Sequence, residues 1–225
     1  MSLRTIAVSG LAVAGLLLGP AVAAQAAAPA QLTGTQLASR LLPASYFPSG
    51  YKIVKAASFN TGSRLEHAPA RFHLATFSCK RFMLKGLPGS GFGETAAAGR
   101  TVANQRVATA YQQAVLQFAS SSKASTFYRQ LYAFIARCRT VTAPFNHGTA
   151  RLTTQSLKKT HLGTLRAFRA KQTFTAPGIP AVAGDTLVTV SGRDIYFIEA
   201  AGVKKAPSKP ALPAAALRLI ARVRA

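Results

Sequence analysis

The sequence predicts an α+β fold, in which one domain combines an antiparallel β-sheet with helices and carries one disulfide. Strand-like runs follow one another in the second half of the chain, two of them joined by a hairpin-type turn. Segment 122–138 instead has apolar residues at three- and four-residue steps, typical of an amphipathic helix. Roughly 200 residues follow the N-terminal leader without an internal linker, which is enough for one domain with a core. Neighbouring strands joined by hairpins, combined with helices, are typical of an α+β domain.

The leader has the pattern of a secretory signal peptide. Arg4 precedes an apolar run over residues 6–18, and small residues with Ala-x-Ala spacing follow. The run is shorter than the roughly 20 residues that a membrane span needs. Cleavage after Ala23 and after Ala26 fits the spacing equally well, and we choose Ala26. The predicted organisation is a signal peptide, a short linker and one domain, over residues 1–26, 27–34 and 35–225.

The chain contains two cysteines, Cys79 and Cys138, and each has basic neighbours. Nearby cations stabilise a thiolate, so a reactive cysteine is one interpretation. In an exported protein, however, an isolated pair of cysteines is more typical of a disulfide. We therefore predict a Cys79–Cys138 bridge and a secreted, extracellular protein.

Three elements are predicted before residue 92. A short helix begins at Thr33 or Thr35, which can cap it, and ends at Pro43. The run "YKIVKAAS" is β-branched and roughly alternating, so it predicts a strand. The stretch "TFSCKRFMLKGLPGSG" predicts a compact helix, capped by Ser78 and ended by Gly86, with Cys79 in its first turn.

Segment 94–120 is rich in Thr, Val and small residues, and predicts a turn or irregularity at residues 98–100 followed by a long strand. The helix that comes next has a serine cap at 120–122, and its apolar stripe ends in Cys138. The stripe is predicted to be buried against the sheet and consists of Ala124, Phe127, Leu131, Phe134, Ile135 and Cys138.

The remainder of the chain predicts strands and a final helix. The strand-like runs are "ARLTTQSLK", "LGTLRAFRAKQTFTA" and "DTLVTVSGRDIYFIEAAGV", and "SGRD" in the last of these predicts a tight hairpin turn. Asp194 lies in that turn, where it favours local backbone hydrogen bonds. The closing segment predicts a helix with Pro213 in its first turn.

The sequence offers no set of residues typical of catalysis or metal binding. Ser120 and Lys123 match a serine-x-x-lysine spacing, but the companion motifs are absent and a serine cap explains the position. The glycine-rich "GLPGSGFGETA" lacks dinucleotide-binding spacing and predicts a loop before a strand. No catalytic carboxylate pair stands out among Glu66, Glu94, Asp185, Asp194 and Glu199. The histidines also lack metal-ligand spacing: His67, His73, His147 and His161. We predict no enzyme activity, no metal and no cofactor.

The charge of the chain is strongly positive, at +23, with 28 Lys and Arg residues against 5 Asp and Glu. Such a charge attracts anionic polymers and membrane surfaces, but it also serves solubility. Several cations gather near the C-terminus, where they are either solvated helix residues, favoured near a helix C-terminus, or an anion-binding patch. We define the basic C-terminal patch as Lys204, Lys205, Lys209, Arg218, Arg222 and Arg224.

The order of motifs resembles a known family. The stretches "LLPASYFPSGY", "FSCKRFM", "GFGETA" and "AVLQFASSSKASTFYRQLYAFIARC" are similar to those of actinobacterial secreted sensor-domain proteins, related to the extracellular sensor domain of PknH-type serine/threonine kinases. The resemblance covers about residues 35–222. It implies a twisted antiparallel sheet against helices, a cleft and a ligand-binding or sensing role without known catalysis. Kinase-linked members carry two disulfides, whereas this chain has cysteines for one and lacks tryptophan.

Two functions follow as hypotheses. The first is a secreted, non-enzymatic, sensor-like module that binds an unknown small ligand of the cell envelope or extracellular space. The alternative is a basic surface protein that binds an anionic envelope polymer, or makes peripheral membrane contact, through its charge. Specific nucleic-acid binding is not expected. Salt separates the two, because binding to many phosphates weakens steeply as salt rises whereas binding in an apolar cleft changes little.

Overall fold

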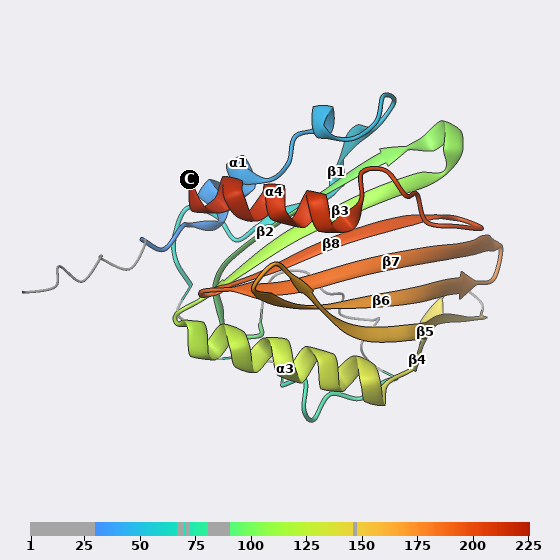
Figure 1. Ribbon diagram of the computed structural model, residues 1–225. Coiled ribbons are helices and arrows are strands. Elements are labelled where there is room, and N and C mark those ends of the chain that lie inside the picture. The colour runs from blue at the N-terminus through green and yellow to red at the C-terminus, as the bar shows by residue number, and fades with distance from the viewer. Residues whose placement is uncertain (1–29, 67–69, 71–72, 81–90, 146–147) are drawn as a thin grey trace, which may run out of the picture.

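The fold is built on one antiparallel sheet of eight strands in the order β1-β2-β3-β8-β7-β6-β5-β4 (Figure 1). This computed structural model describes residues 30–66, 70, 73–80, 91–145 and 148–225. The predicted signal peptide, residues 1–26, and the first three residues of the predicted linker, 27–29, therefore lie outside the described residues. Every pair of neighbouring strands is antiparallel, as predicted for an α+β domain.

The strands are long and the described helices are few. The strands are β1 Lys52–Asn60, β2 Glu94–Asn104, β3 Thr109–Phe118, β4 Thr140–Phe145, β5 Gly148–Leu162, β6 Leu165–Ala176, β7 Ile179–Ser191 and β8 Asp194–Val203. The described α-helices are α1 Gly34–Arg40, α3 Ser121–Arg137 and α4 Leu212–Arg224, with 3-10 turns η1 Ala44–Tyr46 and η2 Gln105–Val107.

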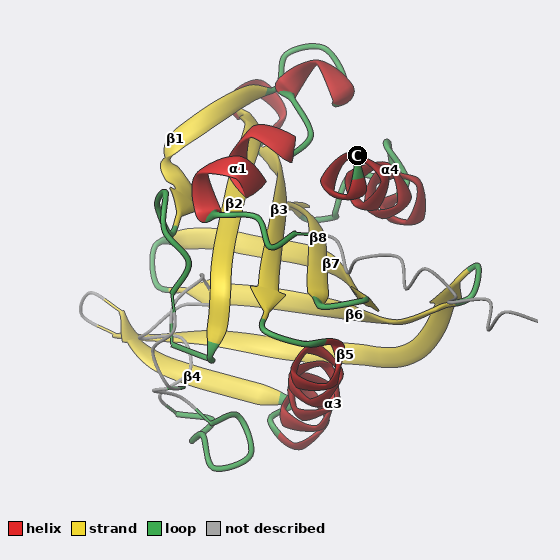
Figure 2. Cartoon of the chain, turned by 90° about the vertical axis from the view of Figure 1, so that its left-hand side faces the viewer, coloured by secondary structure: helices red, strands yellow, loops and turns green. Residues whose placement is uncertain are grey.

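The described helices lie on opposite sides of the sheet. Figure 2 shows α1 and α4 together on one side and α3 on the other, and it shows β4, β5 and β6 running across the direction of β2 and β3. The buried side chains follow the same division. One core cluster joins α1 and α4 to sheet residues such as Val102 and Tyr196, and the other joins α3 to residues such as Leu116 and Phe168.

Helix α3 follows the pattern predicted from its sequence. The side chain of Ser120 accepts a hydrogen bond from the backbone N–H of Lys123, which satisfies one of the free amides of the first turn. Cys138 is the C-terminal cap. The stripe residues Phe127, Leu131 and Phe134 are buried, and Leu131 is fully inaccessible to solvent. These residues therefore form core, as expected, whereas Ile135 of the predicted stripe is only partly buried and packs at the edge of the cluster.

The two terminal helices begin where the sequence indicated. Thr33, rather than Thr35, caps α1: its hydroxyl accepts from the N–H of Gln36, and the Gln36 side chain accepts from the N–H of Thr33. Pro213 lies in the first turn of α4, where the missing backbone N–H costs nothing. The "SGRD" turn is also confirmed, because Ser191 pairs with Asp194 and Gly192 has a positive φ of 61°.

Of the turn or irregularity predicted at residues 98–100, the turn is wrong, whereas the pairing of β1 with β2 is irregular here and shifts register between Val54–Thr101 and Phe59–Gly99. Strand β2 continues through this segment, and the chain reverses at η2 instead, where Ala108 has a left-handed φ of 47°. A glycine is needed at position 99 because the ring of Phe59 lies against the backbone there. A Cβ built at Gly99 would be 2.1 Å from a Phe59 ring carbon. The glycine thus marks a close approach of a side chain and not a turn.

Three further points need correction or remain open. Strand β4 was not predicted at all. Asp194 does not use its side chain for local backbone bonds; its carboxylate accepts from the Gln117 amide at 3.0 Å and the Tyr196 hydroxyl at 3.3 Å. The helix predicted around Cys79 falls largely on residues 81–90, which lie outside the described residues, and Cys79 itself lies in a turn.

Candidate functional site

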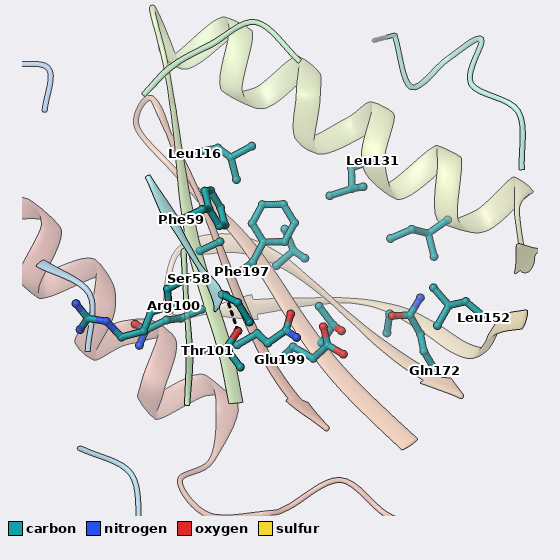
Figure 3. A pocket seen from close by; sticks show the side chains of 18 of the residues that line it. Ser58, Phe59, Arg100, Thr101, Leu116, Leu131, Leu152, Gln172, Phe197 and Glu199 are labelled. Atoms are coloured by element: carbon teal, nitrogen blue, oxygen red, sulfur yellow. Dashed lines mark hydrogen bonds between the residues drawn. The ribbon is translucent and has the colours of Figure 1, made fainter. Parts of the chain in front are cut away.

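A cavity of about 560 Å³ lies between α3 and the face of the sheet that α3 covers (Figure 3). Its lining comes from strands β1, β2, β3, β5, β6, β7 and β8 and from the C-terminal half of α3. The volume falls in the range of small-molecule sites, which are concave and mostly apolar with a few polar groups.

The wall nearest α3 is apolar. Its larger side chains come from five strands and the helix: Phe59, Leu116, Leu131, Ile135, Leu152, Val188 and Phe197. Alternation along the strands places these residues on the α3 face of the sheet, so they extend the α3 core cluster to the edge of the cavity. In Figure 3, Phe59, Leu116, Leu131 and Phe197 lie toward the helix, whereas Thr101 and Glu199 lie away from it.

The other side of the cavity is polar and follows the strand register. Thr101 of β2 pairs with Gln112 of β3, Gln112 pairs with Glu199 of β8, and Glu199 pairs with Thr186 of β7. Residues that are directly opposite in adjacent strands share a face, so these four side chains form one row across the sheet. We call them the polar row. Gln172 of β6 also lines this side of the cavity.

Glu199 is the carboxylate of the polar row. Within the described residues it makes no hydrogen bond or ion pair, and burial raises its pKa to about 7, with the nearby charge of Asp185 as a second cause. Glycine at position 184 leaves room for it, because a Cβ there would lie 3.0 Å from Glu199 Oε1. The cavity thus contains an ionisable group without a protein partner.

The polar side chains around Glu199 are partly satisfied by hydrogen bonds within the protein. The Thr101 hydroxyl donates to the carbonyl oxygen of Ala57 at 3.0 Å, and Gln172 Nε2 donates to the Thr154 hydroxyl at 3.1 Å. Thr186 Oγ1 is buried and has no partner in the described part of the chain. A buried polar atom is usually satisfied, so Thr186 is a place where a ligand atom would be stabilised.

Arg100 lines the cavity but directs its guanidinium to the opposite face of the sheet (Figure 3). There it donates to the carbonyl oxygens of Ala38, Leu41 and Leu42, at 2.9, 3.2 and 3.0 Å. These carbonyls lie at the C-terminal end of α1, where helical carbonyl groups lack intrahelical partners. Arg100 therefore anchors α1, and burial lowers its pKa together with the charge of Arg222.

The predicted disulfide is present. Cys79 and Cys138 are bonded with a Cα–Cα distance of 5.4 Å, and the structure contains no free cysteine among its described residues. The bridge joins the segment before residue 81 to the end of α3. Arg137 reinforces the same junction, because it donates to the carbonyl oxygens of Leu74, Ala75 and Phe77.

The basic C-terminal patch is only partly free. Arg222 donates to the carbonyl oxygens of Arg40 and Ser39, and Arg224 donates to the Ser191 hydroxyl, so both arginines join α4 to its neighbours. The side chains of the other four members make no hydrogen bond or ion pair in the described part of the chain, and all four residues are exposed: Lys204, Lys205, Lys209 and Arg218. Anion binding by this patch stays a prediction.

The carboxylates are dispersed. Glu94 accepts from the backbone N–H groups of Gly91 and Phe92, Asp185 pairs with Arg169, and Asp194 is bonded to Gln117 and Tyr196. The described residues contain no group of three or more His, Cys, Asp or Glu side chains placed to hold a metal ion. Among the described helices, none has the length and apolar character needed to cross a bilayer.

Comparison with solved structures gives a match to the fold. The extracellular domain of PknH from Mycobacterium tuberculosis matches with a TM-score of 0.58 and 16% sequence identity, over 86% of this chain and 97% of that one. The chain shares the fold of the PknH extracellular domain. The resemblance predicted from the sequence motifs is thereby confirmed at the level of the fold.

Other comparisons add little to the PknH-like fold. A putative uncharacterized protein from Mycobacterium smegmatis, described as an Rv0999 ortholog, matches with a TM-score of 0.41 and 11% identity, over 84% of this chain and 97% of that one. No family model matches the chain. A search of curated proteins also gives no match.

The sequence did not single out the residues of the cavity. Glu199 was considered only as a member of a catalytic pair. The signal that could have found it is its position in "IYFIEAAG", where one carboxylate interrupts a strand that is otherwise apolar and buried at alternate positions.

Proposed function

We propose that the chain is a secreted, non-enzymatic, sensor-like module that binds a small ligand in the cavity beneath α3. The observation that carries this proposal is a cavity of about 560 Å³ with an apolar wall on one side and the polar row on the other, where Glu199 and Thr186 have no hydrogen-bond partner among the described residues. Such a division orients a ligand, because the apolar part gains from burial and the polar part needs hydrogen bonds.

The extracellular location rests on three supports. The N-terminal leader has signal-peptide character, the Cys79–Cys138 disulfide suits an oxidising compartment, and the PknH domain of the same fold is extracellular. The proposed mature chain begins after Ala26. A sensor of this kind would pass its ligand-bound state to a separate partner.

Filling the cavity tests the proposal. Ala114 lines the cavity from β3, so Ala114→Phe adds a ring to its interior, whereas Val107→Phe adds a ring at a position that is 60% exposed on η2. A neutral apolar fluorescent probe should bind the wild type and Val107→Phe alike, and should bind Ala114→Phe at least about tenfold more weakly. Equal binding by all three proteins would contradict the cavity as the site.

A further inference from the structure

The charge that faces the cavity is opposite in sign to that of the chain. Glu199 and Arg100 are the charged residues among its lining, and Arg100 is bonded to the end of α1 on the far face. In a chain with 28 Lys and Arg residues and 5 Asp and Glu, a position that presents a carboxylate alone is not explained by composition.

No neighbouring cation of the described chain is placed to pair with Glu199. Arg169, on β6, is paired with Asp185 of β7, and alternation puts both on the opposite face of the sheet. Lys159 of β5 lies over the ring of Tyr132, 5.1 Å from its centre, and Arg137 of α3 donates to backbone carbonyls. The carboxylate is therefore left for a group from outside.

The free groups of the polar side include donors and acceptors, but the Glu199 carboxylate is the one that can carry a charge. The hydroxyl proton of Thr101 and one amide proton of Gln172 are used within the protein. What remains includes both Glu199 carboxylate oxygens, the Gln172 carbonyl oxygen, the buried Thr186 hydroxyl and the Gln112 amide. An ammonium group offers three donors and a positive charge, so it complements the Glu199 carboxylate, which a carboxylate or a carbonyl group of a ligand would not.

Resting on the function proposed above, we propose that the ligand is a small amphiphilic amine: its ammonium group binds Glu199 within the polar row, and its apolar part lies against Phe59, Phe197 and Leu131 beneath α3. Binding desolvates both charges together, so the ion pair replaces the water that each loses. The pair also holds Glu199 ionised at a pH where the empty cavity favours the neutral acid.

A matched series of octyl compounds tests the ligand class. Octylamine, octanol and octanoate share one apolar chain and differ in the head group, and an alkylammonium stays charged at pH 8, as lysine does. Calorimetric titration of the wild type at pH 8 should show octylamine binding about tenfold or more tightly than octanol, with octanoate weakest. Glu199→Gln should reduce the preference for the amine to about threefold or less, whereas Glu66→Gln, outside the cavity, should retain it.

The pH dependence gives a second readout. The amine preference should weaken from pH 8 to pH 5, as Glu199 is protonated in the empty cavity, and Glu199→Gln should not show this change. Gly184→Ala serves as a further variant, because its Cβ displaces the carboxylate without removing it. It should lower the affinity for octylamine and leave that for octanol nearly unchanged.

The outcomes separate the two proposals. If octanol and octylamine bind equally well and Ala114→Phe blocks both, the cavity is a binding site but the proposed ligand class, an amine, is wrong. A preference for octanoate, or a preference for the amine that survives in Glu199→Gln, also overturns the proposal that Glu199 binds an amine. If no octyl compound and no neutral probe binds, the proposed function itself fails.

Discussion

Glu199 of β8 lies directly opposite Thr186 of β7, and neither side chain has a hydrogen-bond partner within the described residues. A cross-strand pair on a sheet face is normally satisfied by its neighbours or by packing. Here the pair faces a cavity instead, since Gly184 provides no side chain beside it.

The stability of the protein should fall as the pH rises from about 4.5 to about 7. The pKa of Glu199 is raised from 4.5 in the unfolded chain to about 7 in the folded protein. The stability that the neutral acid contributes is therefore fully present below pH 4.5, and it is lost as the pH rises through about 7. The loss amounts to up to about 3 kcal/mol, at 1.36 kcal/mol per pKa unit. Urea unfolding of the wild type and of Glu199→Gln from pH 4 to pH 8 measures it.

The variant should lack this part of the pH dependence. Burial also raises the pKa of Asp194, which has the same sign, so Asp194→Asn is the matched control and should retain the Glu199 contribution. Identical pH profiles for the wild type and Glu199→Gln would mean that Glu199 is solvated in the folded protein.

Truncating Leu131 should destabilise the fold. Its side chain is fully buried on α3, and removing a buried leucine side chain typically costs about 2–5 kcal/mol. Leu217 on α4 is 48% exposed, so Leu217→Ala should change the free energy of unfolding by less than about 0.5 kcal/mol. If Leu131→Ala is as mild as Leu217→Ala, the α3 stripe does not form core.

The disulfide should contribute a few kcal/mol. It links residues 59 apart, and the chain-entropy model gives about 4 kcal/mol for a loop of this size. Cys79→Ser and Cys138→Ser should each lower the unfolding free energy by a comparable amount. Thiol titration of the denatured, unreduced wild type should read close to zero, whereas one or two titratable thiols would show that the bridge does not form.

Binding through the basic C-terminal patch should depend on its four free cations. A variant with Lys204, Lys205, Lys209 and Arg218 changed to glutamine removes exposed charges, whereas Arg222→Gln removes bonds to Arg40 and Ser39 and should destabilise α4. The fourfold variant should retain stability and lose any binding to anionic vesicles seen at low salt, at about 1 kcal/mol for each cation near the surface. If the wild type ignores such vesicles at low salt, the patch is not a binding surface.

Local patterns in the sequence were sufficient to predict elements whose caps, turns and apolar stripes lie close together in the chain. The stripe and cap of α3, a threonine cap of α1 and the "SGRD" hairpin were all predicted from residues close together in the chain. The alternative of a turn at Gly99 was wrong, because the glycine makes room for the ring of Phe59, 40 residues earlier, which no local pattern shows.

The cavity could not be predicted for the same reason. Its polar row joins residues of β2, β3, β8 and β7, and only the strand order and register bring Thr101, Gln112, Glu199 and Thr186 together. The roles of Arg100 and Arg222 were also hidden, because both bind backbone carbonyls that are distant in sequence. The charge of Arg222 suggested a partner outside the chain, whereas the bonds of both arginines are structural.

The most direct test of the account is to identify the small molecules that the protein retains when it is purified from its native culture medium. Extracts of the wild type and of Ala114→Phe, prepared in parallel, are compared by mass spectrometry, with Val107→Phe as the surface control. A compound enriched with the wild type and Val107→Phe but absent from Ala114→Phe is the predicted result, because Ala114 lines the cavity and Val107 does not. The same compounds in all three extracts, or none in any of them, would contradict a ligand-binding cavity beneath α3.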